Sequence, residues 1–227
     1  MCMIAELHGK AEPSEDLLTS YVFGMIASHG ILPAFHEWFA TAVMVSDGDF
    51  RKNVLLPRDG HSHVALWPSY GEYGIPDATL IVDNTKGRTL IGVEVKYHSG
   101  LSGKQQLGEY AEALALPTSL HLDKWRVRPR FSSFRQPDHT ALLYITRDLR
   151  IPGDDVQSCC ESKIPVYWLS WRGLLRCLRK QGPLSCVPCQ AQIDDLCAVL
   201  RRRDLIAFEG FGILKAWSGR TNFYTRR

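Results

Sequence analysis

The sequence predicts an α/β fold in which a central mixed β-sheet is flanked by helices. Two β-rich runs, Ala78–Val82 and Thr89–Val95, are joined by a polar turn with a glycine, which is typical of an antiparallel hairpin. Two further apolar runs, Ala141–Thr146 and Pro165–Ser170, indicate strands buried on both faces. Segments of helical composition precede, separate and follow these strands.

The first helix is expected to begin after Ser14, which would be its N-cap, with Glu15 and Asp16 in the first turn. Glu15 lies three positions before Leu18 and seven before Val22, so its carboxylate falls on the apolar stripe that faces the protein interior. This is an unusual place for an acid, and Asp16 is the alternative inward-facing residue.

The other elements follow from composition and from breaker residues. A loop-rich stretch is expected between Gly48 and Gly74, with a short strand as an option around His61 and His63. Helices are expected over Pro33–Val43, over Lys104–Leu116 where Pro117 ends the helix, over Trp171–Lys180, and near Gln190–Arg203. We expect a core domain over 1–180 and a C-terminal extension over 181–227 that packs on it.

Composition narrows the class of partner. A formal net charge of +3 is too small for a histone-like binder, yet basic residues gather in the second half of the chain, which fits a polyanionic partner. These clusters cover Lys124–Arg130, Arg147–Arg150, Arg172–Lys180 and Arg201–Arg203.

The apolar segments and the cysteines of the sequence predict where the protein resides and whether its thiols are reduced. No apolar stretch approaches the roughly 20 residues that span a bilayer, and the N-terminus lacks a signal-peptide pattern, so we expect a cytoplasmic protein without a membrane partner. The 7 cysteines are an odd number, which favours reduced thiols. Cys186 and Cys189 form one C-x-x-C without a second well-spaced pair, so neither zinc nor an iron–sulfur cluster is expected.

Three charged residues stand out at one end of the predicted hairpin. Side chains alternate along a strand, so Glu94 and Lys96 point to the same face, and Asp77 at the start of the paired strand can approach them. Unpaired charges in an apolar sheet are costly. A divalent cation such as Mg²⁺ would compensate the carboxylates and activate water. Lys96 would orient that water or help to deprotonate it, and would neutralise charge that builds on the phosphate oxygens. The alternative is a salt-bridge ladder on the surface of an ordinary hairpin.

Pro76-Asp77 followed by Glu94-Val95-Lys96 resembles the defining pattern of the PD-(D/E)XK nuclease superfamily, which includes restriction endonucleases, recombination exonucleases and many phage-defence nucleases. The resemblance implies a restriction-endonuclease-like core with the order α-β-β-β-α-β. It implies that Asp77, Glu94, the backbone carbonyl of Val95 and Glu15 bind Mg²⁺ or Mn²⁺, and that Lys96 serves the attacking water.

Gln106 and Tyr110 extend this resemblance to the Q-x-x-x-Y motif of the recombination-exonuclease branch. Residues four apart share a helix face, and in that branch they shape the metal and DNA site. We therefore count Gln106 with the catalytic residues and Tyr110 with the nucleic-acid contacts. Lys104, at the N-terminus of the same helix, is expected to approach a phosphate. Trp125, Arg126 and Arg128 are expected to line the substrate path through stacking and phosphate contacts.

The sequence thus predicts a Mg²⁺-dependent phosphodiesterase that cleaves nucleic acid, with DNA as the favoured substrate and phage defence as the setting that the resemblance implies. Two cuts in a duplex would favour a homodimer. The alternative function is a catalytically inactive nucleic-acid-binding subunit of a larger complex, recruiting a partner ATPase or another defence subunit. His61, His63 and His98 are interpreted as ordinary loop histidines.

Overall fold

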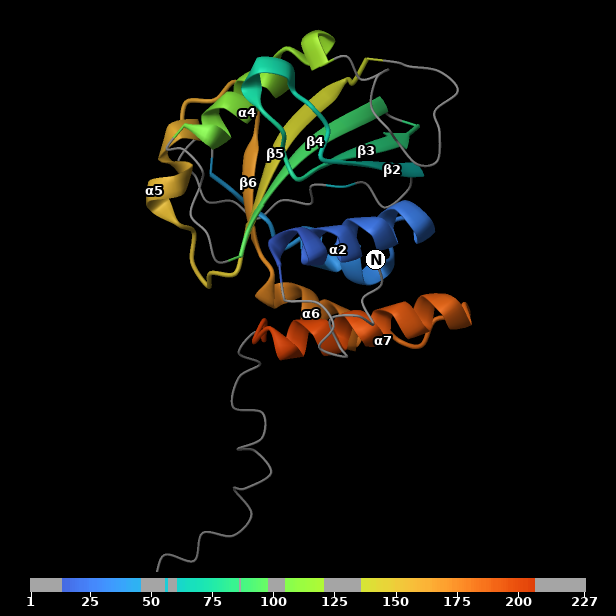
Figure 1. Cartoon of the computed structure of the whole chain (residues 1–227). Helices are drawn as coiled ribbons and strands as arrows, with labels where there is room; N and C mark the ends of the chain where they lie inside the picture. Colours follow the sequence, from blue (N-terminus) through green and yellow to red (C-terminus); the bar gives the residue numbers. More distant parts are fainter. Residues whose placement is uncertain are drawn as a thin grey trace, which may run out of the picture.

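The computed structural model describes residues 14–45, 56, 61–85, 87–97, 105–120 and 136–206. Within these ranges, a six-stranded sheet has the strand order β1-β6-β5-β4-β3-β2 (Figure 1). Strands β2, β3 and β4 pair antiparallel, β4, β5 and β6 pair parallel, and β1 is antiparallel to β6. The prediction of an α/β fold with a mixed central sheet is therefore confirmed. The strands are β1 Val43–Met44, β2 His61–Leu66, β3 Ala78–Asn84, β4 Gly87–Lys96, β5 His139–Thr146 and β6 Val166–Ser170.

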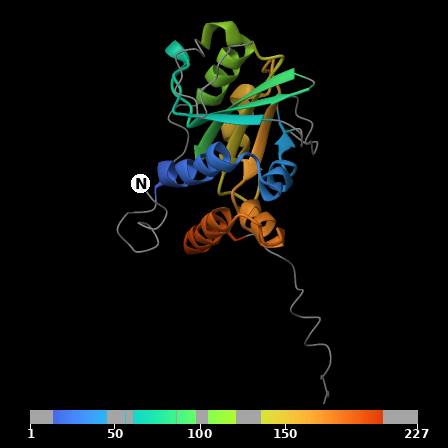
Figure 2. The same cartoon turned by 90° about the vertical axis from the view of Figure 1, so that its right-hand side faces the viewer.

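Helices cover both faces of the sheet (Figures 1 and 2). One buried cluster joins the sheet to α4 and to the segment around α5, and the other joins its opposite face to α2, α3, α6 and α7. The long connection from β4 to the parallel strand β5 contains α4, as parallel strands require a crossover. The helices are α2 Glu15–His29, α3 Pro33–Phe39, α4 Gln106–Ala115, α5 Gly153–Val156, α6 Arg172–Lys180 and α7 Val187–Arg202.

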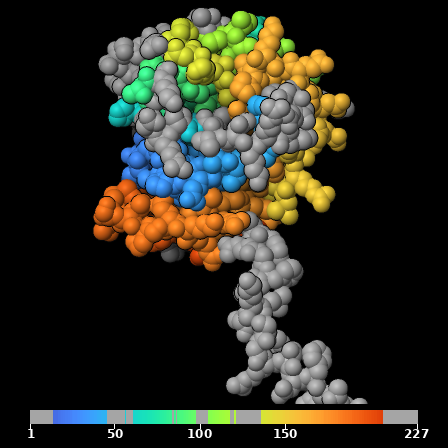
Figure 3. Space-filling view, turned by 180° about the vertical axis from the view of Figure 1, so that it is seen from behind, coloured from blue at the N-terminus to red at the C-terminus, as the bar shows by residue number. Residues whose placement is uncertain are grey.

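Helix α2 is buried on most of its surface because it lies between the sheet and the α6–α7 layer. The space-filling view from behind shows α2 stacked directly on these two helices (Figure 3). Val22 and Phe23 are both fully buried although they lie on different sides of the helix. The Ser14 hydroxyl accepts a 3.1 Å hydrogen bond from the Leu17 amide, which confirms the predicted N-cap.

The predicted hairpin is confirmed, with both strands longer toward the turn than expected. Asp83 pairs with Arg88 and Asn84 with Gly87, so regular pairing continues almost to the tip. Gly87 has φ 146°, and a Cβ there would lie 2.6 Å from the Asp138 carboxylate. Glycine is thus required at this position by both conformation and space.

The expected helix over Pro33–Val43 is wrong in its second half. Helix α3 ends at Phe39, and Val43–Met44 instead form β1, where Val43 pairs with Trp168. A β-branched valine gains more by extending the sheet than by one further helical turn. Strand β2 lies within the loop-rich stretch, where a short strand was the option around His61 and His63, so these two histidines belong to a strand and not to a loop. Helix α7 begins at Val187, three residues before Gln190, because Pro188 fits a first helical turn.

Candidate active site

Asp77 lies directly before β3, where its neighbours place it opposite Glu94. Ala78 pairs with Val93, so the antiparallel register continues to Asp77 and Glu94 and sets both side chains on the face covered by α4. The Asp77 Oδ2 atom accepts a 2.7 Å hydrogen bond from the Val95 amide. The Asp77 carboxylate therefore binds a β4 backbone amide just beyond the last paired residues of β3 and β4.

Glu94 and Lys96 form a close ion pair on β4. The Lys96 Nζ atom lies 2.8 Å from Glu94 Oε1, and the Glu94 side chain is 2% exposed. Lys96 Nζ also lies 3.4 Å from Glu15 Oε1, so the ammonium is held between two carboxylates. Strand alternation predicts that Glu94 and Lys96 share a face, and they do.

Glu15 reaches this cluster from the opposite side of the sheet. It is the first residue of α2, and its Oε2 atom accepts a 2.6 Å hydrogen bond from the backbone amide of Tyr97, just beyond β4. Asp16 is exposed, whereas Glu15 is half-buried. Of the two candidate acids, Glu15 is thus the one that lies in the site.

Gln106 and Tyr110 come from α4 and complete the cluster. Gln106 Nε2 donates hydrogen bonds to Glu94 Oε1 at 2.9 Å and to the Tyr110 hydroxyl at 3.1 Å. The Tyr110 hydroxyl in turn donates to the backbone carbonyl of Ile75 at 3.1 Å, two residues before Asp77. These bonds link the start of α4 to the Glu94 carboxylate and to the backbone just before Asp77.

Burial opposes ionisation of the two hairpin carboxylates. Desolvation is the largest cause that raises the pKa of Glu94 to about 7, and the nearby Asp77 charge adds to it against the lowering effect of Lys96. Desolvation likewise raises the pKa of Asp77 to about 6, although the Val95 amide and Lys96 lower it. Burial alone would lower the pKa of Lys96, but Glu94, Glu15 and Asp77 together raise it, so Lys96 stays an ammonium.

The donor set has the chemistry of a hard divalent cation site. Asp77, Glu94 and Glu15 supply carboxylate oxygens, and the Val95 carbonyl points to the same strand edge as the Val95 amide that binds Asp77. Mg²⁺ and Mn²⁺ prefer such oxygen ligands. Across the described ranges, no group of three or more His, Cys, Asp or Glu side chains is already arranged around a metal position. In this arrangement the Lys96 ammonium contacts Glu94 and Glu15 directly.

Other residues singled out from the sequence lie either outside the described part of the chain or away from this cluster. Lys104, Trp125, Arg126, Arg128 and His98 lie outside the described residues. His61 pairs with Asp83 and His63 with Ile81, which places both toward the far end of β3 from Asp77. Cys186 and Cys189 lie at the start of α7. This helix belongs to the α6–α7 layer, which is separated from the sheet by α2.

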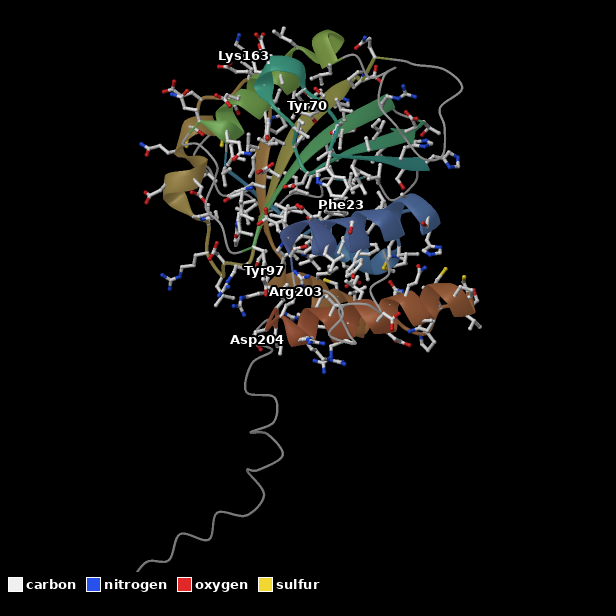
Figure 4. The ribbon with its side chains drawn as sticks, viewed as in Figure 1. Phe23, Tyr70, Tyr97, Lys163, Arg203 and Asp204 are labelled. Carbon is white, nitrogen blue, oxygen red and sulfur yellow. The ribbon has the colours of Figure 1, made fainter. Side chains whose placement is uncertain are left out.

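An aromatic and two arginines beside the site were not singled out individually from the sequence. The guanidinium of Arg203 lies 5.3 Å from the centre of the Tyr97 ring and that of exposed Arg147 lies 5.7 Å from it. Figure 4 shows Tyr97 and Arg203 together at one end of the sheet. Arg147 follows Thr146, which pairs with Lys96. In the sequence, both arginines are marked only as members of the basic clusters Arg147–Arg150 and Arg201–Arg203.

Comparison of the chain with protein-family models, with curated proteins and with solved structures finds no match in any of the three. Among the described helices, none is both long and apolar enough to cross a membrane.

Proposed function

We propose that the protein is a metal-dependent nuclease that hydrolyses phosphodiester bonds of nucleic acid, with DNA as its substrate. The observation that carries the proposal is the convergence of half-buried Asp77 and fully buried Glu94 with Lys96 at the end of one hairpin. Such a cluster costs folding free energy, because desolvation raises the pKa of both acids. Perturbed acids gathered around one charged side chain are typical of catalytic sites.

The order of elements supports a restriction-endonuclease-like core. Helix α2 is followed by the antiparallel strands β2, β3 and β4, then by α4 and the parallel strand β5. When α3 and β1, which lie between α2 and β2, are set aside, this order agrees with the α-β-β-β-α-β order that the Pro76-Asp77 and Glu94-Val95-Lys96 resemblance implies. Fold order alone does not establish an activity, so the carboxylate cluster remains the principal support.

Each residue of the cluster has a distinct task in this proposal. Asp77, Glu94, Glu15 and the Val95 carbonyl would hold a divalent cation, which when bound supplies Lewis acidity toward a phosphate oxygen and water. The Lys96 ammonium would donate a hydrogen bond that orients the attacking water and would offset charge that develops on the phosphate. Because the carboxylates raise the pKa of Lys96, it acts as a donor rather than as a base in this arrangement.

Gln106 would act as a positioning residue. Its amide holds Glu94 at 2.9 Å and Tyr110 at 3.1 Å, and Tyr110 holds the chain just before Asp77. Partners of metal-binding carboxylates fix their orientation in this way. Arg147, exposed at the end of β5 next to Lys96, is placed to contact a phosphate neighbouring the scissile one.

The test is cleavage of circular and linear DNA, single- and double-stranded, in Mg²⁺, Mn²⁺ or EDTA. We compare the wild type with Lys96→Met, and with Lys163→Met as a matched control. Lys163 is exposed and lies away from Tyr97 and the site end of β4 (Figure 4). We expect metal-dependent cleavage that Lys163→Met retains and Lys96→Met loses by about 100-fold or more, as when one transition-state donor is removed. Equal cleavage by Lys96→Met and the wild type would refute the assigned role.

A further inference from the structure

A second cluster of reactive groups lies at the N-terminus of α7. Cys186 is the N-cap residue, and Cys189 lies one helical turn further along. Their Sγ atoms are 2.6 Å apart, and both cysteines are free thiols. Cys186 is exposed, whereas Cys189 is buried with 6% of its surface accessible. The turn thus presents one sulfur to solvent and keeps a second sulfur directly behind it.

His29 contacts the buried member of this pair. Its Nδ1 atom lies 3.2 Å from Cys189 Sγ, and its Nε2 atom lies 2.6 Å from Gln192 Oε1. An amide oxygen only accepts hydrogen bonds, so Nε2 carries the proton and Nδ1 presents its lone pair to the Cys189 thiol. The last residue of α2 and a residue of α7 therefore place a base beside Cys189.

We propose that Cys186 and Cys189 are a thiol–disulfide exchange site that reacts with low-molecular-weight disulfides and closes to an intramolecular disulfide. The proposal is independent of the nuclease function, since these residues share no contact with Asp77, Glu94 or Lys96 among the contacts described above. It rests on the paired sulfurs, their unequal exposure and the imidazole, which together provide an attacking group, a resolving group and a proton acceptor.

The reaction balances in two steps. The exposed Cys186 thiol loses its proton to solvent, and its thiolate attacks one sulfur of the small disulfide. The S–S bond of that molecule breaks, a mixed disulfide forms on Cys186, and the first group leaves as a thiolate that takes up a proton from solvent. Cys189 then passes its proton to His29 Nδ1 and attacks Cys186 Sγ, so the second group leaves as a thiolate that takes that proton from His29, and the Cys186–Cys189 disulfide remains. The protein loses two electrons and two protons, and the small disulfide gains both.

Hydrogen bonding at the turn supports this division of roles. In the reduced state the single Cys189 S–H donates to Cys186 Sγ, and this hydrogen bond and the Cys189 backbone amide favour the charged form of Cys186 and lower its pKa. Once Cys186 is in the mixed disulfide, the same proton turns to His29 Nδ1, 3.2 Å from Cys189 Sγ. The same thiol–thiol hydrogen bond, with burial, raises the pKa of Cys189. The exposed sulfur is therefore the attacking thiolate and the buried one stays protonated until the second step.

The experiment uses the full chain, reduced and then exposed to glutathione disulfide, alkylated and digested with trypsin. Cleavage after Lys180 and Arg201 leaves Cys186, Cys189 and Cys197 on one peptide. We expect this peptide to carry the alkyl group at Cys197 only and to be two hydrogens lighter than the same peptide with free thiols at Cys186 and Cys189. Dithiothreitol should reverse this change completely. Cys160→Ser, which removes an exposed thiol elsewhere, should give the same result.

Three variants separate the steps. Cys189→Ser should stop at a glutathione adduct on Cys186, Cys186→Ser should form neither adduct nor disulfide at this turn, and His29→Gln should form the adduct normally but close the disulfide more slowly. Wild-type protein in which all three thiols of the peptide stay open to alkylation after oxidation would overturn the proposal. Pairing through Cys197, or protection of the thiols by a bound zinc ion, would overturn it as well.

Discussion

At the scale of single residues, the site is a balance between burial and charge. Glu94 is almost fully enclosed, and its nearest cation, Lys96, is shared with Glu15. Asp77 keeps one hydrogen bond from a backbone amide. Desolvation still outweighs these contacts, so the pKa values of both Asp77 and Glu94 are higher in the folded protein than in a free carboxyl group. A bound cation would remove this conflict, because it compensates carboxylate charge directly.

Removing the Asp77 charge should therefore stabilise the protein, although it would also remove a ligand of the proposed cation. The raised pKa of Asp77 means that its stabilising protonated form is fully present below about pH 4 and is lost as the pH rises through about 6. In EDTA, we expect Asp77→Asn to raise the free energy of unfolding by about 2–3 kcal/mol at pH 8 and by about half as much at pH 5. Urea denaturation at both pH values measures this.

The matched control for this prediction is Asp154→Asn, an exposed acid at the start of α5. It should leave stability within about 0.5 kcal/mol of the wild type at both pH values, as most surface substitutions do. A wild-type protein more stable than Asp77→Asn at pH 8 without metal would show that burial does not oppose this charge.

At the scale of elements, the site depends on where α2 and α4 begin. The cap on Ser14 fixes the first turn of α2, and Glu15 in that turn reaches across the end of β4 to the Tyr97 amide. The first residue of α4, Gln106, meets Glu94 from the other side. The N-terminus of α4 thus contacts Glu94, and the N-terminus of α2 contacts Lys96 and the Tyr97 amide at the end of the same strand.

Loss of the α2 cap should have a measurable effect. Ser14→Ala removes the acceptor for the Leu17 amide, and we expect the free energy of unfolding to fall by about 1 kcal/mol. Ser20→Ala is the matched control, because the Ser20 hydroxyl donates back to the Leu17 carbonyl inside the helix, a bond that slightly weakens helices. Equal losses for the two variants in thermal denaturation would contradict the assigned cap.

The elements also show how far the sequence alone could predict this structure. Strands β3 to β6 were predictable because each is a run of apolar residues between turn signals. The two-residue strand β1 was not predictable. Val43 and Met44 extend the sheet by pairing with β6, and such a long-range pairing leaves no local pattern in the sequence. Likewise, strand alternation placed Glu94 beside Lys96, but no local signal indicated that Arg147 and Arg203 would meet at Tyr97.

At the scale of the whole molecule, α7 is tied to the site by long-range contacts. The Arg203 guanidinium donates to the Ser14 carbonyl at 2.8 Å, and the Tyr97 hydroxyl donates to the Arg203 carbonyl at 2.7 Å. The end of α7, the start of α2 and the end of β4 are thus joined at one point, next to Glu15. Such contacts couple the stability of the whole fold to the geometry of the carboxylates.

Addition and removal of metal should consequently act on the folding of the entire chain. A cation that binds only the folded state raises stability by mass action. We expect Mg²⁺ or Mn²⁺ to raise the Tm of the wild type at pH 8, EDTA to reverse the rise, and Asp77→Asn to show little change. An unchanged wild-type Tm at millimolar metal would count against a cation site at these carboxylates.

The most direct test of the nuclease proposal is the conversion of supercoiled circular duplex DNA in Mg²⁺ by the wild type and by Glu94→Gln. The amide keeps the shape of Glu94 and a carbonyl acceptor for Gln106, but removes a carboxylate ligand. The proposal predicts relaxed or linear product with the wild type and none with Glu94→Gln, once circular dichroism shows both to be folded. Equal product from both proteins would contradict it, because the activity would then come from somewhere other than this site.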